Sequence, residues 1–317
     1  MWLIRNEEET NEDYGKRPEE RTIEERIRNS ILIVDKHSGP TSHQITDWVK
    51  KIFNLKKAGH AGTLDPKVTG VLPIALENAT KLMPALMGLD KEYVGIMRLH
   101  KDVELDFLRK FIAENFVGRI KQIPPRKSAV ARRIREKTVY FFDVLEKEDK
   151  NVLFHTKVEA GTYIRKLCHD IGEKLGIGAH MVELRRIKFG PFDEEQAHPL
   201  VEIKDAYDLW KEEGEEKYLK EILINVEDAI PHIKKIFVKD SAIYALTNGA
   251  PLYVGGIVRI QKGIVPGELV AIFSLKNELI ALGIAKMDSE KMFSSKRGVA
   301  VRIDRVIMPK GTYPKLY

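Results

Sequence analysis

The stretch that says most about the fold is GHAGTLDPKVTGVLP, residues 59–73. Gly59, Gly62 and Gly70 allow a positive φ or a close approach of two backbones. Pro66 disfavours a helical conformation at Asp65, and the run VLPIAL that follows is typical of a short buried strand. We therefore expect Asp65 on an irregular loop that enters a sheet, where functional residues concentrate. The alternative is an Asx-turn, in which the Asp65 carboxylate accepts a bond from its own backbone.

The composition is that of a globular chain. It has 317 residues, of which 43% are hydrophobic and 32% charged, which is enough for two domains and a sizeable core. The longest apolar runs, VLPIAL and LVAIF, are too short to cross a bilayer, and MWLIRNEEET lacks the apolar segment of a secretory signal. Cys168 is the single cysteine, so an internal disulfide is excluded and we expect a reducing, cytoplasmic location.

Charge is unevenly distributed along the chain, whose net charge is +6. Residues 230–317 hold fourteen Lys and Arg against six Asp and Glu, whereas residues 1–30 hold six against nine. A basic C-terminal segment favours a polyanionic partner such as nucleic acid, although a solvated lysine-rich surface explains it equally well. The acidic segment 1–30 carries no apolar stripe, so it is either a disordered tail or a partner for the basic segment.

Local patterns suggest where elements begin and end. ILIVDKHSGPTSHQITDWVKKIF is typical of a strand, a turn and a helix, with Thr41 or Ser42 as the helix N-cap. A second helix is expected near residues 78–88, capped by Asn78. After Pro231, short apolar runs alternate with turns rich in Gly, Asn and Pro, which is typical of a small β-barrel.

Several kinds of chemistry are not expected. The chain has no CxxC pair, HExxH, Walker loop or GxGxxG, so we predict neither a metal site nor a cofactor. Cys168, His169 and Asp170 are consecutive on a predicted helix, so their side chains point in different directions. We interpret them as a packed cysteine beside surface residues and not as a nucleophilic triad.

Five motifs, taken in order, resemble a known family. GHAGTLDPKVTGVLPIAL, KEYVG, QIPPRKSAVARR and GTYIRKLCHDIGEKLGIGAHMVELRR resemble the TruB-type pseudouridine synthases, and FVKDSAIYALTNGAPLYVGGI resembles the start of a PUA domain. The acidic extension and KSAVARRIREKTVYFFDVLE are similar to the dyskerin branch of the family, whose archaeal members are catalytic subunits of H/ACA guide-RNA particles. The resemblance implies an α+β fold. It also implies a catalytic domain (residues 31–229) with a mixed, mainly antiparallel sheet, followed by a PUA β-barrel (230–317) on which residues 1–30 are expected to pack.

The resemblance also assigns roles to individual residues. Asp65 falls on the essential aspartate, Tyr93 on the tyrosine that stacks on the target base, and Arg165 on the aspartate's partner. Leu184 falls on an apolar pocket residue, and His60 on a histidine that helps to fill the space of the flipped base. These residue types suit the reaction, because a nearby guanidinium keeps a carboxylate ionised and an aromatic face holds an extruded base.

The remaining expectations concern RNA and partner proteins. RNA contacts are expected at Arg126, Lys127, Arg132, Arg133, Asn248, Gly249 and Lys310. The alternatives are a solvated charged loop and ordinary turn residues. The family implies an H/ACA guide RNA, an rRNA substrate and the T-loop uridine of tRNA as a second candidate. It also implies a zinc-ribbon protein, a glycine/arginine-type β-barrel protein and a kink-turn-binding ribosomal-like protein, and no membrane. A stand-alone tRNA enzyme and a non-catalytic RNA scaffold are the alternative functions.

Overall fold

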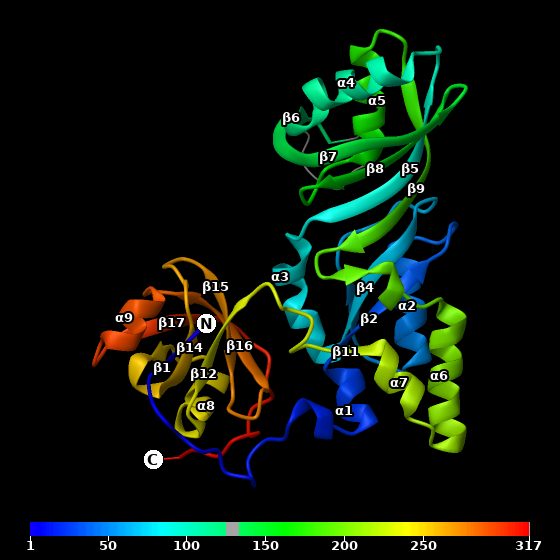
Figure 1. Cartoon of the computed structure of the whole chain (residues 1–317). Helices are drawn as coiled ribbons and strands as arrows, with labels where there is room; N and C mark the ends of the chain where they lie inside the picture. The colour runs from blue at the N-terminus through cyan, green and yellow to red at the C-terminus, as the bar shows by residue number, and fades with distance from the viewer. Residues whose placement is uncertain (125–132, 317) are drawn as a thin grey trace.

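The computed structural model describes residues 1–124 and 133–316, and it contains a large domain beside a smaller C-terminal domain (Figure 1). Within those residues the large domain has a ten-stranded sheet, whose main path runs β11-β2-β4-β9-β5-β8-β7-β6. Its strands are β2 (Ser30–Lys36), β3 (Ala58–His60), β4 (Thr69–Leu76), β5 (Lys91–Leu99), β6 (Gly118–Gln122), β7 (Arg135–Glu148), β8 (Asn151–Val158), β9 (Ala179–Phe189), β10 (Phe192–Asp193) and β11 (Leu223–Asn225). Most neighbours are antiparallel, which confirms the expected α+β fold with a mainly antiparallel sheet.

The two halves of the sheet are connected at its centre by the pairing of β4 with β9. β4 is buried along nearly its whole length, as its apolar run predicted, and it pairs with β2 over six residues. On its other side β4 meets β9 in parallel, through Thr69 opposite Arg185 and Gly70 opposite Arg186. This short pairing joins the two halves of the sheet, and the loop that carries Asp65 leads directly into it.

Helices cover this sheet (Figure 1). They are α1 (Ile23–Arg28), α2 (Ser42–Ile52), α3 (Met83–Met87), α4 (Leu105–Phe116), α5 (Ile164–Lys174), α6 (Leu200–Glu213) and α7 (Lys217–Ile222), with 3-10 turns at η1 (Pro18–Glu20), η2 (Glu77–Leu82) and η3 (Glu194–Gln196). Thr41, one of the two expected caps, accepts a bond from the Gln44 backbone and begins α2. In the described part of the chain, no helix is both long and apolar enough to cross a membrane.

Of two local predictions, the packed Cys168 is confirmed and the helix cap at Asn78 is not. Cys168 is fully buried on α5, and burial raises the pKa of its thiol to about 12, which confirms a packed cysteine and not a nucleophile. The prediction of a helix capped by Asn78 is wrong, because residues 77–82 form the 3-10 turn η2 and α3 starts beyond it. Pro84 at the start of α3 sets the later beginning, and the Asn78 side chain instead donates to Asn29 Oδ1 at 3.2 Å.

The C-terminal domain is a curled sheet of seven strands within the described residues, in the order β1-β14-β12-β15-β16-β17-β13. Its elements are β1 (Trp2–Ile4), β12 (Lys234–Val238), α8 (Asp240–Thr247), β13 (Leu252–Tyr253), η4 (Val254–Gly256), β14 (Ile257–Gln261), β15 (Leu269–Phe273), β16 (Leu279–Ala285), α9 (Ser289–Ser294) and β17 (Val299–Val306). The three-residue turn η4 joins β13 at one edge to β14 near the other. The sheet must therefore curl until its edges approach, as a small barrel does.

The first part of the acidic N-terminal segment, residues 1–16, lies along this domain, whereas α1 packs in the core of the large domain. β1 pairs antiparallel with β14, and the side chain of Arg5 donates to backbone carbonyls of α9 and its C-cap. Ion pairs join Glu8 to Lys239 at 2.5 Å and Glu12 to Lys276 at 3.7 Å. In the structure the first residues of the acidic segment therefore pair with the basic C-terminal segment.

The two domains share part of one hydrophobic core. Buried residues from both sides pack in a single cluster, including Ile31, Ile33, Val71 and Ala75 from the large domain, and Phe237, Phe273 and Leu282 from the C-terminal domain. Arg21 and Glu227 form a nearly buried ion pair at 2.7 Å close to this boundary. The C-terminal domain is consequently packed against the large domain through apolar side chains, and not held by a linker alone.

Candidate active site

Asp65 lies on the irregular loop between β3 and β4, as the Asp-Pro pair predicted. Its carboxylate pairs with the guanidinium of Arg165, which stands in the first turn of α5, 100 residues further along the chain. Each of these two side chains is about half exposed. Among the described residues Asp65 makes no side-chain bond to its own loop, so the structure does not have the Asx-turn.

The loop is held by buried polar groups on both sides of Asp65. Lys36 is fully buried, and its Nζ donates to the carbonyls of His37, Pro66 and Val68 at 2.8–3.0 Å. Burial lowers the pKa of Lys36, while the nearby Asp65 charge opposes that shift. Ser42 Oγ accepts from Leu64 N at 2.9 Å and donates to Leu64 O at 3.1 Å. The sequence did not predict that Lys36 and Ser42 hold this loop. The strand-turn-helix segment that contains both residues was the signal that could have pointed to them.

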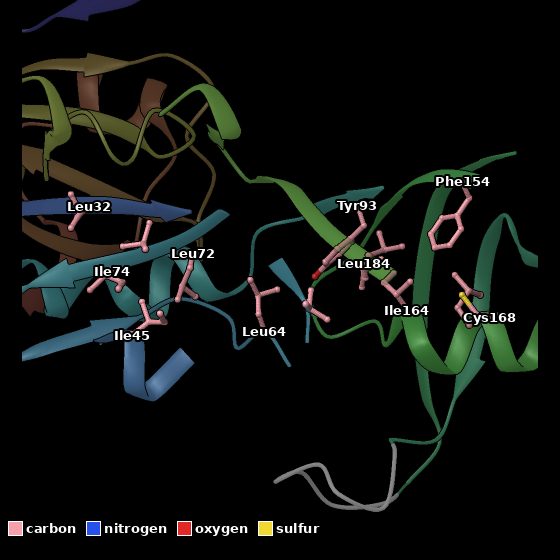
Figure 2. Packing of buried hydrophobic residues seen from close by; sticks show 14 of the residues in the cluster. Leu32, Ile45, Leu64, Leu72, Ile74, Tyr93, Phe154, Ile164, Cys168 and Leu184 are labelled. Carbon is pink, nitrogen blue, oxygen red and sulfur yellow. The ribbon is translucent and has the colours of Figure 1, made fainter. Parts of the chain in front are cut away.

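A cluster of buried apolar side chains lies beside the ion pair of Asp65 and Arg165. Tyr93 on β5 and Leu184 on β9 are each 8% exposed, and both pack in one cluster with Leu64 and Ile164. Figure 2 shows Tyr93 and Leu184 next to each other, with the Tyr93 hydroxyl directed towards the Leu64 side. Because Leu64 and Ile164 directly precede Asp65 and Arg165 in sequence, the charged pair lies at the rim of this cluster.

His60 occupies β3 at the entrance to the same loop. Its ring meets that of His43 edge to face, with 4.8 Å between centroids. Its Nδ1 is buried and has no hydrogen-bond partner in the part of the chain that the structure describes. Burial, with smaller contributions from His43 and Arg186, lowers the pKa of His60 to about 4. The ring is therefore neutral at pH 7, with a buried nitrogen that has no partner among the described residues.

The expected RNA contacts are dispersed. Arg126, Lys127 and Arg132 lie outside the described residues, whereas Arg133 is exposed. Asn248 follows the end of α8 and is exposed, as are Gly249, which has φ of +87°, and Lys310. In residues 1–124 and 133–316 no group of three or more His, Cys, Asp or Glu side chains could hold a metal ion.

Comparison with known proteins identifies the family. The model of the TruB family pseudouridylate synthase N-terminal domain matches residues 50–164, and that of the tRNA pseudouridylate synthase B C-terminal domain matches residues 165–231. A protein of Methanopyrus kandleri named "Probable tRNA pseudouridine synthase B" is 53% identical over 315 residues, which cover 99% of this chain and 93% of the relative. The chain belongs to the TruB family. It is therefore a pseudouridine synthase, as its motifs predicted.

The same likeness extends over the full length of this TruB-family chain. A PUA domain matches residues 234–307 and a DKCLD (NUC011) domain matches residues 1–46. A relative of the same name from Methanocaldococcus jannaschii is 51% identical over 99% of this chain and 94% of its own.

Two solved structures are similar over the whole chain. A chain in an H/ACA RNP bound to a substrate RNA containing 2'-deoxyuridine has a TM-score of 0.92 at 48% identity, covering 100% of this chain and 97% of that one. A chain in a Cbf5-Nop10-Gar1 complex has a TM-score of 0.93 at 51% identity, covering 100% and 96%.

Proposed function

We propose that this pseudouridine synthase is the catalytic subunit of an H/ACA guide-RNA particle, acting on rRNA uridines and, as a second substrate, on the T-loop uridine of tRNA. The observation that carries the proposal is the full-length likeness to chains solved inside H/ACA assemblies, one of them with substrate RNA bound. The likeness includes the N-terminal extension and the PUA domain, neither of which contributes a residue to the pair of Asp65 and Arg165. The relatives named as tRNA enzymes support the second substrate.

The partners follow from the same comparison. Nop10 and Gar1, named in the similar complex, are the accessory proteins that we propose for this chain as its zinc-ribbon and glycine/arginine-type partners. The guide RNA and the kink-turn-binding ribosomal-like protein complete the proposed particle. A cytoplasmic location is part of this proposal, because it supplies RNA substrates and a reducing environment for the free thiol of Cys168.

The site residues suit isomerisation of uridine. The reaction breaks the bond between ribose C1′ and N1 of the base, turns the base, and joins C1′ to C5, while C5 loses a proton and N1 gains one. Asp65 attacks ribose or base, or removes a ribose proton, and each route requires an ionised carboxylate. Arg165 contacts Asp65 and fixes the orientation of its carboxylate. Tyr93 and Leu184 provide the apolar surface that holds the flipped base.

Reconstitution tests the proposal. The chain is assembled with guide RNA, Nop10-type and Gar1-type proteins and a kink-turn-binding protein, and pseudouridine is mapped in rRNA and tRNA. We expect guide-directed modification of rRNA. Modification of bare tRNA alone would favour the stand-alone enzyme, and RNA binding without any pseudouridine would favour the scaffold.

The substitution Asp65→Asn tests the role of the carboxylate. Asn keeps the size of the side chain and removes its charge, so turnover should be abolished while RNA affinity stays within about twofold. The assay is single-turnover pseudouridine formation at saturating RNA. Asp47→Asn is the matched control, because Asp47 is an exposed acid on α2 that pairs only with Lys50 at 3.3 Å among the described residues. Product formation by Asp65→Asn at a substantial fraction of the wild-type rate would contradict the assignment.

A further inference from the structure

Arg186, on β9, is an arginine buried beneath the site without a carboxylate partner in the described residues. Its side chain is 1% exposed. Its Nε donates to Val71 O at 2.7 Å and its Nη2 to Gly62 O at 3.0 Å. The guanidinium also lies over the Phe189 ring, 5.1 Å from its centroid. A buried cation that is satisfied by carbonyls and a ring is costly to maintain, so its position calls for an explanation.

The sheet register places Arg186 against Tyr93. The two residues are directly opposite each other in the antiparallel pair of β5 and β9, so their side chains share one face of the sheet. Burial lowers the pKa of Arg186, while the electrostatic effect of the Tyr93 hydroxyl and, after it, its hydrogen bonding oppose that shift. Gly62 lies three residues before Asp65, so one guanidinium contacts both the loop of Asp65 and the tyrosine.

The direction of the bond between them is fixed by chemistry. Arginine has only donors, so the Tyr93 oxygen must accept, and the hydroxyl's own proton must point away from Arg186. The hydroxyl is directed to the Leu64 side of the cluster, next to the loop of Asp65 (Figure 2). A fixed positive charge behind the oxygen also stabilises any negative charge that develops there during proton transfer.

We propose that Arg186 is a positioning residue that orients the Tyr93 hydroxyl, with its proton turned towards the pocket, for transfer to or from the uracil base. This inference rests on the pseudouridine synthase activity of the site. Its consequence is that Arg186 affects the chemical step through one oxygen atom, without touching the RNA.

A double-mutant cycle tests the inference. Arg186→Lys keeps a charge but loses the planar fork that reaches Val71, Gly62 and Tyr93 together. We expect its single-turnover rate at saturating RNA to fall about tenfold, with RNA affinity within about twofold of wild type. In a Tyr93→Phe background, where the oxygen is absent, the same substitution should lower the rate by less than about twofold. An equal loss in both backgrounds would overturn the inference and leave Arg186 as an anchor of the loop.

A separate variant controls for effects of a buried arginine on folding stability. Arg21→Lys alters another nearly buried arginine, whose partner is Glu227 at 2.7 Å and which lies at the domain boundary. It should lower the thermal midpoint while the single-turnover rate stays near wild type. If Arg186→Lys does not fold, NMR can test the contact between Arg186 and the Tyr93 hydroxyl. The measurement compares hydrogen exchange of the Arg186 side-chain protons in wild type and in Tyr93→Phe. Faster exchange in Tyr93→Phe supports the contact, and unchanged exchange overturns it.

If neither the wild-type chain nor the reconstituted particle forms pseudouridine, the proposed function fails before this cycle begins. The two failures are therefore distinguishable.

Discussion

At the level of single residues, we expect the half-exposed pair of Asp65 and Arg165 to affect catalysis more than stability. Exposed ion pairs contribute roughly 0–1 kcal/mol to folding, whereas removing one partner of a buried pair typically costs about 3–5 kcal/mol. Arg165→Ala should therefore leave the free energy of unfolding within about 1 kcal/mol of wild type. It should nevertheless abolish turnover, because the carboxylate loses the group that orients it. Urea unfolding and single-turnover assays measure the two effects; a loss of RNA affinity in proportion to activity would make Arg165 a phosphate contact.

His60 makes stability depend on pH. In the folded chain its pKa is lowered to about 4 from the ordinary 6.5, mainly by burial. Between those values the unfolded chain binds a proton that the folded chain does not, so stability falls as the pH drops from 6.5 towards 4. We expect a loss of roughly 1–2 kcal/mol, allowing for the partial exposure of the ring. Urea unfolding at pH 7 and pH 4.5 should show a smaller loss for His60→Gln than for wild type. The exposed His169→Gln serves as control, and equal losses in all three chains would contradict the expectation.

At the scale of secondary structure, the joint between β4 and β9 depends on Gly70. This residue has φ of +99°, and a Cβ added to it would lie 2.2 Å from the carbonyl oxygen of Arg186. Two penalties therefore coincide, a strained backbone and a clash with backbone that cannot move aside. We expect Gly70→Ala to separate the two halves of the sheet, with a loss of several kcal/mol or no folded chain.

Gly176→Ala is the matched control for that substitution. Gly176 has φ of +72° but open space around its Cα, so alanine there carries the backbone strain alone. Its loss should be about 1–2 kcal/mol by denaturant unfolding. Similar losses in the two variants would show that the strand contact at Gly70 has no special importance.

At the scale of the whole molecule, the apolar boundary between the domains changes how RNA binding should be tested. Deleting residues 230–317 would expose the buried side chains of Ile31, Ile33 and Ala75, so lost RNA binding could reflect lost folding. Substitution of an exposed cation avoids this problem. Lys310→Gln should weaken guide-RNA binding and reduce the slope of log affinity against log salt by up to roughly 0.9, if Lys310 contacts one phosphate of a duplex.

The comparison is guide-RNA affinity at several salt concentrations for wild type and Lys310→Gln. Lys204→Gln is a control on α6 of the large domain, where Lys204 already pairs with Asp208. An unchanged slope for Lys310→Gln would remove Lys310 from the RNA surface. Glu8 and Glu12 form ion pairs with lysines of the C-terminal domain and neutralise part of its positive charge. The positive charge available to bind RNA is therefore smaller than the net charge of residues 230–317.

Local patterns in the sequence were enough to predict individual elements and the family. The buried strand β4, a helix cap at Thr41 or Ser42 and the irregular loop of Asp65 follow from the apolar run, the hydroxyls and the Asp-Pro pair, which act within a few residues. Asn78 failed as a cap because the packing of η2 and α3 overrode a local preference. The ordered motifs predicted the pseudouridine synthase family without any coordinates.

The surroundings of these residues depend on packing between distant parts of the chain. Asp65 and Arg165 meet across 100 residues of chain, and their half exposure depends on how the two halves of the sheet join. The burial of Lys36 and Arg186, ordinary charged residues in the sequence, depends on strands and loops far away along the chain. The physical reason is that periodicity reports which face of an element is apolar, whereas burial, charge environment and partner are properties of the packed assembly.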